Sequence, residues 1–278
     1  MASPLAARID ASAADGAPPQ VNAMGWMRLC CRVAVLLLGL ALTTPPHYIW
    51  RLLRLGSPWP RLFLALAARC SGARIVRRGT PLKRDVFYVA NHVSWIDICA
   101  MGATSGTAFV SKAAIAESPI VGWMARQNRT VFVKREDKLN IAEQINELRD
   151  ALADNWAVTI FPEATTSDGQ SLLPFKTSML KVLEPPPMGV LVQPVHLDYG
   201  AVAEEIGWIG VETGTNNAIR ILSRARSFPL VVTFLEPFNP ADFPGRKAIA
   251  AECRARIEVA LVAALGRPLR PFTAHSAP

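Results

Sequence analysis

The chain has 278 residues, 51% of them hydrophobic, and a formal net charge of +8, so it can form a substantial core. The positive charge is N-terminal, because residues 1–84 hold 12 Lys and Arg against two acidic residues and the remainder holds 18 against 20. Those arginines lie among Leu, Trp and Phe rather than in a polar arm, which argues against nucleic acid and favours anionic membrane lipids as partners.

The N-terminal third divides into two parts. Residues 1–23 are rich in Ala, Ser and Pro without apolar periodicity, which predicts disorder. Residues 24–70 are expected to form a membrane-associated helical segment. Within it, residues 33–50 carry no charge, and as a helix they would be roughly 27 Å long, close to the thickness of a bilayer core.

Pro45 and Pro46 are expected to break this helix. Arginines on both sides of it leave its orientation open and favour a segment that dips into one leaflet and returns, with a single span as the alternative. A second, amphipathic helix is expected over residues 52–68. We expect a protein on the cytoplasmic face of a bacterial inner membrane, monotopic or single-span. A cleaved signal peptide fits less well.

Residues 71–278 read as one catalytic domain. Buried strands are expected where short apolar runs occur, at residues 86–90, 107–110, 130–133, 158–161, 190–195 and 230–234. Helical spacing recurs between them, at residues 137–154 and 246–265. This alternation predicts an α/β fold with a mostly parallel sheet flanked by helices on both faces.

Five cysteines, an odd number without a metal-ligand spacing, predict reduced thiols, and no metal site is expected. Cys30 and Cys31 are expected to pack as ordinary apolar residues, with acylation as the alternative.

The most informative motif is residues 86–97, in which an apolar strand ends at Asn91 and His92 and Asp97 follows five positions later. Strand ends are where α/β sheets build sites. A neutral imidazole can accept a proton from an alcohol if a partner fixes its tautomer, and Asp97 is placed to do so. Five residues of regular helix would separate the two side chains by roughly 140°, so His92 must lie on the turn before a helix that Ser94 could cap. The alternative is a buried histidine and an aspartate that merely favours a helix start.

Other reactive side chains follow neighbouring strand ends. Glu163 is followed by Thr165, Thr166 and Ser167, and the cations Lys134, Arg135 and Lys176 and a further histidine, His196, lie near other strand ends. Each is unremarkable alone, but together they resemble the way an α/β active site is assembled.

These motifs resemble the glycerolipid acyltransferases of the 1-acylglycerol-3-phosphate acyltransferase (PlsC-like) type, over roughly residues 85–200. The four matching motifs are Asn91, His92 and Asp97; Arg135; residues 161–167; and residues 192–195. The resemblance implies a transferase of phospholipid biosynthesis that moves an acyl group from acyl-CoA or acyl carrier protein to a lysolipid hydroxyl, without a cofactor. It assigns acceptor binding to Arg135 and Glu163, with Lys134, Thr165, Thr166 and Lys176 as further candidates.

Two positions depart from the family pattern. Ala164 replaces the usual glycine, which is tolerated if the backbone there does not need a positive φ. Thr166 replaces an arginine that commonly holds the acceptor's phosphate. The expected acceptor is 1-acylglycerol-3-phosphate, giving phosphatidic acid. The alternative is lyso-ornithine lipid or another lysolipid, which the resemblance implies because bacterial relatives with Thr at this place include acyltransferases that act on lyso-ornithine lipids.

Three rival functions or mechanisms stay open. Ser94 or Cys99 could form an acyl-enzyme, although neither lies in a nucleophile elbow. Water could replace the alcohol, which would make the protein a thioesterase. The protein could also be an inactive, membrane-docked lipid-binding protein.

Overall fold

A computed structural model describes residues 16–133 and 157–271 of the chain. Within these ranges one seven-stranded sheet has the order β1-β7-β6-β2-β5-β3-β4. The strands are β1 Ala73–Arg78, β2 Val86–Ala90, β3 Ala108–Lys112, β4 Val131–Val133, β5 Ala157–Ile160, β6 Leu191–Asp198 and β7 Phe228–Phe234. Neighbouring strands are parallel except for β6 and β7, so the prediction of a mostly parallel sheet is confirmed.

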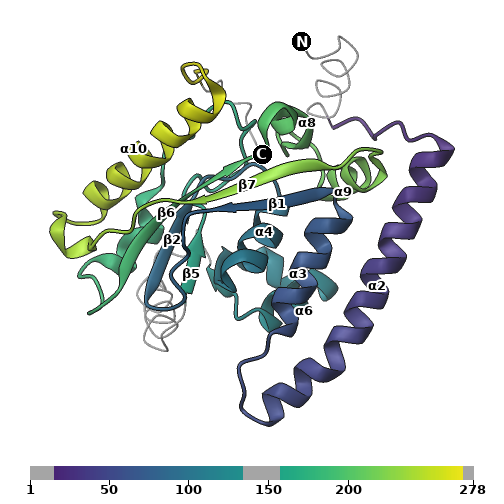
Figure 1. The fold of residues 1–278 in the computed structure, drawn as a ribbon, viewed down its shortest axis with the longest axis horizontal. Helices are drawn as coiled ribbons and strands as arrows, with labels where there is room; N and C mark the ends of the chain where they lie inside the picture. The colour runs from purple at the N-terminus through teal and green to yellow at the C-terminus, as the bar shows by residue number, and fades with distance from the viewer. Residues whose placement is uncertain (1–15, 134–156, 272–278) are drawn as a thin grey trace.

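Helices cover both faces of the sheet (Figure 1). Helices α3 Trp59–Cys70 and α4 Ile96–Ser105 lie on one face, and α10 Arg246–Leu265, at the predicted bounds, lies on the other. Side chains alternate along β2, so Tyr88 packs in the core cluster of α3 and α4, whereas Phe87 packs in the cluster of α10. The shorter helices are α5 Ala113–Glu117, α6 Pro119–Gln127, η1 Thr177–Leu183, η2 Gly200–Val202, α8 Ala203–Ile206, α9 Gly214–Ser223 and η3 Pro240–Asp242.

The N-terminal helix is longer than expected. Helix α2 runs unbroken over Ala23–Leu52 with Pro45 and Pro46 inside it, so the predicted break is wrong. Contacts on both sides of the proline pair explain this. Near one end Arg32 Nη1 donates to the carbonyl of Leu222 at 2.8 Å, and near the other His47 Nε2 lies 3.1 Å from Gln127 Oε1. These contacts can offset the cost of the missing helix hydrogen bonds.

Two further features differ from expectation in this region. Helix α3 starts at Trp59 rather than residue 52, because residues 53–58 form a connection containing Gly56 and Pro58. Cys30 and Cys31 are exposed on α2 instead of packed in the protein. The predicted helix at residues 137–154 lies outside the described residues.

Candidate active site

His92 and Asp97 meet at the carboxyl end of β2. His92 lies on the turn that leaves the strand, and Asp97 lies in the first turn of α4. The Nδ1 atom of His92 is 2.8 Å from Asp97 Oδ2. The geometry that the five-residue spacing demands is therefore present, because the histidine precedes the helix.

The Asp97 carboxylate is fully buried and accepts hydrogen bonds on both oxygens. Its Oδ2 atom accepts from the backbone N–H of Val93 at 2.7 Å and of Ser94 at 2.9 Å, in addition to His92. Its Oδ1 atom accepts from the hydroxyl of Tyr199 at 2.5 Å. The carboxylate thus ties down the turn before α4. Ser94 is not the N-cap residue of α4, which is Trp95, but its Oγ still accepts a long hydrogen bond of 3.5 Å from the backbone N–H of Ile96, the first residue of the helix.

The imidazole of His92 is held from one side and open on another. Its ring stacks on Phe161, with centroids 4.1 Å apart and planes at 18°. The side chain remains 17% exposed, whereas that of Asp97 is fully buried. A hydrogen bond from Nδ1 to a carboxylate places the proton on Nδ1, which leaves a lone pair on Nε2. The ring can therefore accept a proton from a group that reaches it from solvent.

Glu163 acts on the backbone of the same turn. Its Oε1 accepts from the N–H of His92 at 2.8 Å, and its Oε2 accepts from the N–H of Leu173 at 3.0 Å. Burial raises the pKa of Glu163 to about 8, against the opposing effect of these two donors. With both oxygens used by the backbone and the residue only 2% exposed, this geometry favours organising the loop over direct acceptor binding.

Two further contacts fix the turn relative to its neighbours. The backbone N–H of Ser167 donates to the carbonyl of His92 at 2.8 Å, and its Oγ does so at 3.1 Å. The side-chain amide of Asn91 pairs with the backbone of Leu197 on β6, accepting at 2.8 Å and donating at 3.0 Å. The first and third motifs therefore form one hydrogen-bonded unit across three neighbouring strands.

Comparison with known proteins identifies the family of the chain that contains this unit. A family model described as acyltransferase matches residues 68–198. A lyso-ornithine lipid O-acyltransferase from Rhodobacter capsulatus is 33% identical over 255 residues, covering 86% of this chain and 91% of the relative.

The chain belongs to the acyltransferase family.

Two other similarities extend the comparison. A 1-acyl-sn-glycerol-3-phosphate acyltransferase from Neisseria gonorrhoeae is 37% identical to this acyltransferase over 117 residues, 42% of this chain and 46% of the relative. The crystal structure of a 1-acyl-sn-glycerophosphate acyltransferase, PlsC, from Thermotoga maritima has the same fold, with a TM-score of 0.62 and 17% identity over 87% of this chain and 98% of that one.

At the position of the family glycine, the acyltransferase does use a left-handed backbone. Ala164 has φ 66°, so the tolerance expected for a methyl group at an ordinary φ does not apply. A non-glycine residue in this region is strained by roughly 1–2 kcal/mol. The loop thus keeps the left-handed backbone that usually requires glycine, although residue 164 is alanine.

The remaining predicted binding residues are less closely gathered. The hydroxyl of Thr166 donates to the carbonyl of Trp208, and the Thr165 side chain is exposed. Lys176 is exposed, and its backbone N–H donates to the carbonyl of Pro162 at 2.8 Å, next to Glu163. Lys134 and Arg135 lie outside the described residues.

Neither rival nucleophile is accessible in this acyltransferase. Ser94 is fully buried. Burial raises the pKa of Cys99 to about 12, with the nearby charge of Asp97 acting in the same direction, so the reactive thiolate is disfavoured. Among the described residues no group of three or more His, Cys, Asp or Glu side chains is arranged to hold a metal ion.

His196 does not join His92. Its neighbours Val195 and Leu197 belong to the core cluster of α4, so alternation along β6 points His196 to the opposite face of the sheet. There burial lowers its pKa to about 4, and its Nε2 atom has no hydrogen-bond partner among the described residues. We assign it no part in the site.

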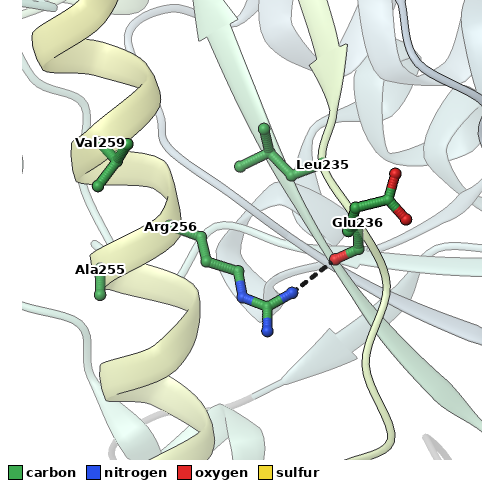
Figure 2. A pocket seen from close by; sticks show the side chains of 5 residues that line it. All are labelled: Leu235, Glu236, Ala255, Arg256 and Val259. Carbon is green, nitrogen blue, oxygen red and sulfur yellow. Dashed lines mark hydrogen bonds between the residues drawn. The ribbon is translucent and has the colours of Figure 1, made fainter.

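A shallow hollow of about 300 Å³ lies beside α10 (Figure 2). It is lined by Leu235, Glu236, Ala255, Arg256 and Val259, and Arg256 Nη1 donates to the carbonyl of Glu236 at 2.9 Å. The hollow shares no residue with the His92 site.

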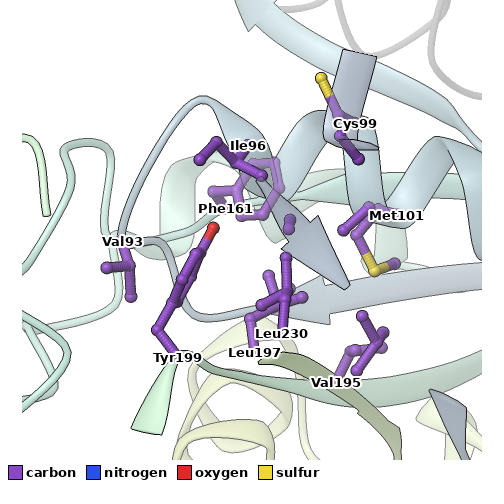
Figure 3. Close-up of a cluster of buried hydrophobic side chains, with 14 of the residues drawn as sticks. Val93, Ile96, Cys99, Met101, Phe161, Val195, Leu197, Tyr199 and Leu230 are labelled. Atoms are coloured by element: carbon purple, nitrogen blue, oxygen red, sulfur yellow. The ribbon is translucent and has the colours of Figure 1, made fainter. Parts of the chain in front are cut away.

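Sequence reasoning missed three contributors to the site: Phe161 as a stacking partner, Trp208 as the partner of Thr166, and Tyr199. Figure 3 shows Tyr199 entering the apolar cluster that also contains Val93, Ile96 and Phe161. An aromatic residue after a buried strand is usually read as core, and a single chain cannot show its polar contact.

Proposed function

We propose that this acyltransferase moves a fatty acyl group from an acyl thioester to the free hydroxyl of a lysolipid, with His92 as the general base. The observation that carries the proposal is the partly exposed imidazole whose Nδ1 atom is bonded to the buried Asp97. The donor is acyl-CoA or acyl carrier protein, and no cofactor is needed.

The reaction follows from this arrangement. His92 Nε2 removes the hydroxyl proton as the lysolipid oxygen attacks the thioester carbonyl, and Asp97 stabilises the imidazolium that forms. The tetrahedral intermediate then expels the thiolate, which takes up the proton from His92. The histidine returns to its starting state, so no acyl-enzyme is required.

Lyso-ornithine lipid is the acceptor that we favour. Named relatives that match most of this chain, from Rhodobacter capsulatus and Brucella abortus, are lyso-ornithine lipid O-acyltransferases, at 33% and 30% identity over 86% and 87% of this chain. The phosphate-binding arginine of the family is replaced by Thr166, whose hydroxyl is engaged by Trp208. The acceptor expected first, 1-acylglycerol-3-phosphate, remains the alternative, with Arg135 and Lys134 as its cations.

Membrane docking is carried by α2, which is long and apolar enough to cross a membrane by length and composition. One side of it is an exposed stripe at helical spacing, formed by Met24, Met27, Val35, Leu38, Leu42, Ile49 and Leu52. Both ends of α2 contact the catalytic domain through Arg32 and His47, which supports a helix lying in the plane of one leaflet over a single span. Anionic lipids are proposed as the bound surface because the N-terminal region is basic, and the cytoplasmic face is proposed because anionic lipids give that leaflet its negative surface potential.

The decisive experiment incubates purified protein with labelled acyl-CoA or acyl carrier protein thioester and with lyso-ornithine lipid, 1-acylglycerol-3-phosphate or no acceptor. We expect labelled product with lyso-ornithine lipid. Product from 1-acylglycerol-3-phosphate alone would reject the preferred head group and retain the reaction. Thioester loss that needs no acceptor would indicate a thioesterase, and lipid binding without turnover an inactive binding protein.

A further inference from the structure

Asp97 accepts more hydrogen bonds than orientation of one histidine requires. Its Oδ2 atom serves His92 and two backbone N–H groups, while its Oδ1 atom faces the buried hydroxyl of Tyr199. At 2.5 Å, the contact to Tyr199 is the shortest of these four. A short O–H···O bond to a carboxylate is charge-assisted and roughly twice as strong as a neutral one.

The position of Tyr199 is set by the sheet. It follows β6 directly, and the pairing of Leu197 with Asn91 fixes the register of β6 against β2 two residues earlier. Tyr199 is 1% exposed, and its ring lies 5.9 Å from the ring of Phe228, centroid to centroid. Burial raises the pKa of Tyr199 well above its usual value, so the phenol keeps its proton and acts as a donor.

We propose that Tyr199 is a positioning residue for the acyl transfer. Its hydroxyl holds the Asp97 carboxylate so that Oδ2 faces His92. The same hydrogen bond takes up part of the negative charge with which Asp97 acts on the His92 ring. This inference rests on the proposed role of His92 as base. Tyr199 itself touches neither the proposed substrate nor the transferred proton.

Loss of the hydroxyl has two consequences. The Oδ1 atom would be left without its donor inside an apolar cluster (Figure 3), so the carboxylate could rotate away from His92. The negative charge of Asp97 would also be shared with one hydrogen-bond donor fewer, so the carboxylate would favour the protonated imidazole of His92 more strongly. Both effects alter catalysis, and only the second changes its pH dependence in a defined direction.

Other ionisable groups near Asp97 must stay constant in the test. Glu163 lies on the loop after β5 and Cys99 lies on α4, and both interact electrostatically with Asp97. Replacing Tyr199 by Phe changes neither of them. It also keeps the aromatic ring in the core, so apolar packing is preserved.

The test compares Tyr199→Phe with Tyr88→Phe. Tyr88 is a matched control, since it lies in the same core cluster and donates to the carbonyl of Leu82 instead of to Asp97. We expect Tyr199→Phe to lower kcat roughly 10- to 100-fold, the loss of a hydrogen bond to a charged group, with KM within about twofold. The acid limb of the kcat profile should move to higher pH. Tyr88→Phe should leave that limb in place.

Fluorotyrosine gives a second test that avoids deletion. The chain has three tyrosines, Tyr48, Tyr88 and Tyr199, so uniform 3-fluorotyrosine labelling of the Tyr88→Phe protein changes two of them. A more acidic phenol is a stronger donor, so the acid limb should move to lower pH, and labelled protein that also carries Tyr199→Phe should lack this shift. An unmoved limb in both tests overturns the role of Tyr199 if His92→Ala is inactive. An active His92→Ala protein would instead reject the proposed mechanism.

Discussion

The buried carboxyl group of Glu163 accepts a hydrogen bond from the backbone N–H of His92 at 2.8 Å, so the third motif supports the main chain of the first. Its other oxygen holds the N–H of Leu173 at 3.0 Å. The family glutamate therefore shapes the turn that presents the imidazole, and its replacement should affect folding as well as turnover.

Glu163→Gln should destabilise the protein by about 1–3 kcal/mol, because an amide has one acceptor oxygen and leaves one buried N–H unsatisfied. The penalty should depend on pH. The pKa of Glu163 is about 8 in the folded protein, above its unfolded value, so its stabilising contribution is present below the unfolded value and is lost as pH rises through about 8. Chemical denaturation of both proteins from pH 5 to 8.5 should show the difference shrinking as pH rises.

The exposed Glu236 provides the control for this prediction. Glu236→Gln should leave stability nearly unchanged at every pH. A Glu163→Gln penalty that stays constant or grows across the range would contradict the raised pKa.

Ala164→Gly should stabilise the fold by about 1 kcal/mol, because glycine adopts φ 66° without the strain of a Cβ atom. For a domain of this size the midpoint of thermal unfolding should rise by roughly 2–4 °C. Ala255→Gly, at an exposed position of α10, should instead lower it. An unchanged or lower midpoint for Ala164→Gly would mean that the loop relaxes to accommodate the methyl group.

His92→Ala should lower turnover by roughly two to four orders of magnitude, the usual contribution of a general base. The protein should remain folded, since the ring is partly exposed and its backbone contacts to Glu163 and Ser167 persist. Steady-state acyl transfer and circular dichroism measure the two quantities. Activity within a few-fold of the parent would remove His92 from the mechanism.

Leu38→Glu combined with Leu42→Glu should reduce sedimentation with anionic vesicles. These side chains are 60% and 64% exposed on one face of α2, so their replacement removes apolar surface and adds charges that an anionic membrane repels. The thermal midpoint should stay constant. Met188→Glu, which alters a fully exposed residue outside α2, should leave vesicle binding intact. Equal vesicle binding by the parent, the double variant and Met188→Glu would mean that another surface of the protein docks on the membrane.

The sequence predicted the sheet well where strands are buried on both faces. The residues of β2 and β5 are all buried, and unbroken apolar runs carry that signal. Strand β1 was missed because it lies at the sheet edge, where Arg74, Arg77 and Arg78 are exposed and no apolar run forms. The proline pair led to the opposite error, a predicted helix break that is not present, because local backbone rules do not include the distant contacts of Arg32 and His47.

The site was predictable where its residues are close in sequence. The spacing of His92 and Asp97 and the order of the motifs indicated both the pair and the loop of Glu163. The hydrogen bond of Tyr199 to Asp97 joins residues 102 positions apart, and that of Thr166 to Trp208 joins residues 42 apart. Such pairings depend on strand order, which a single sequence does not encode locally.

Helix α2 also limits how the protein can be handled. Its inner side packs against α3 and α9, and α3 in turn places Ala67 and Ala68 in the core. Deleting the residues before 71 would remove helices that pack on the catalytic domain, together with the segment proposed to dock on the membrane. A form of the protein that is soluble without detergent should therefore be made by replacing the exposed apolar stripe of α2 with polar residues rather than by shortening the chain.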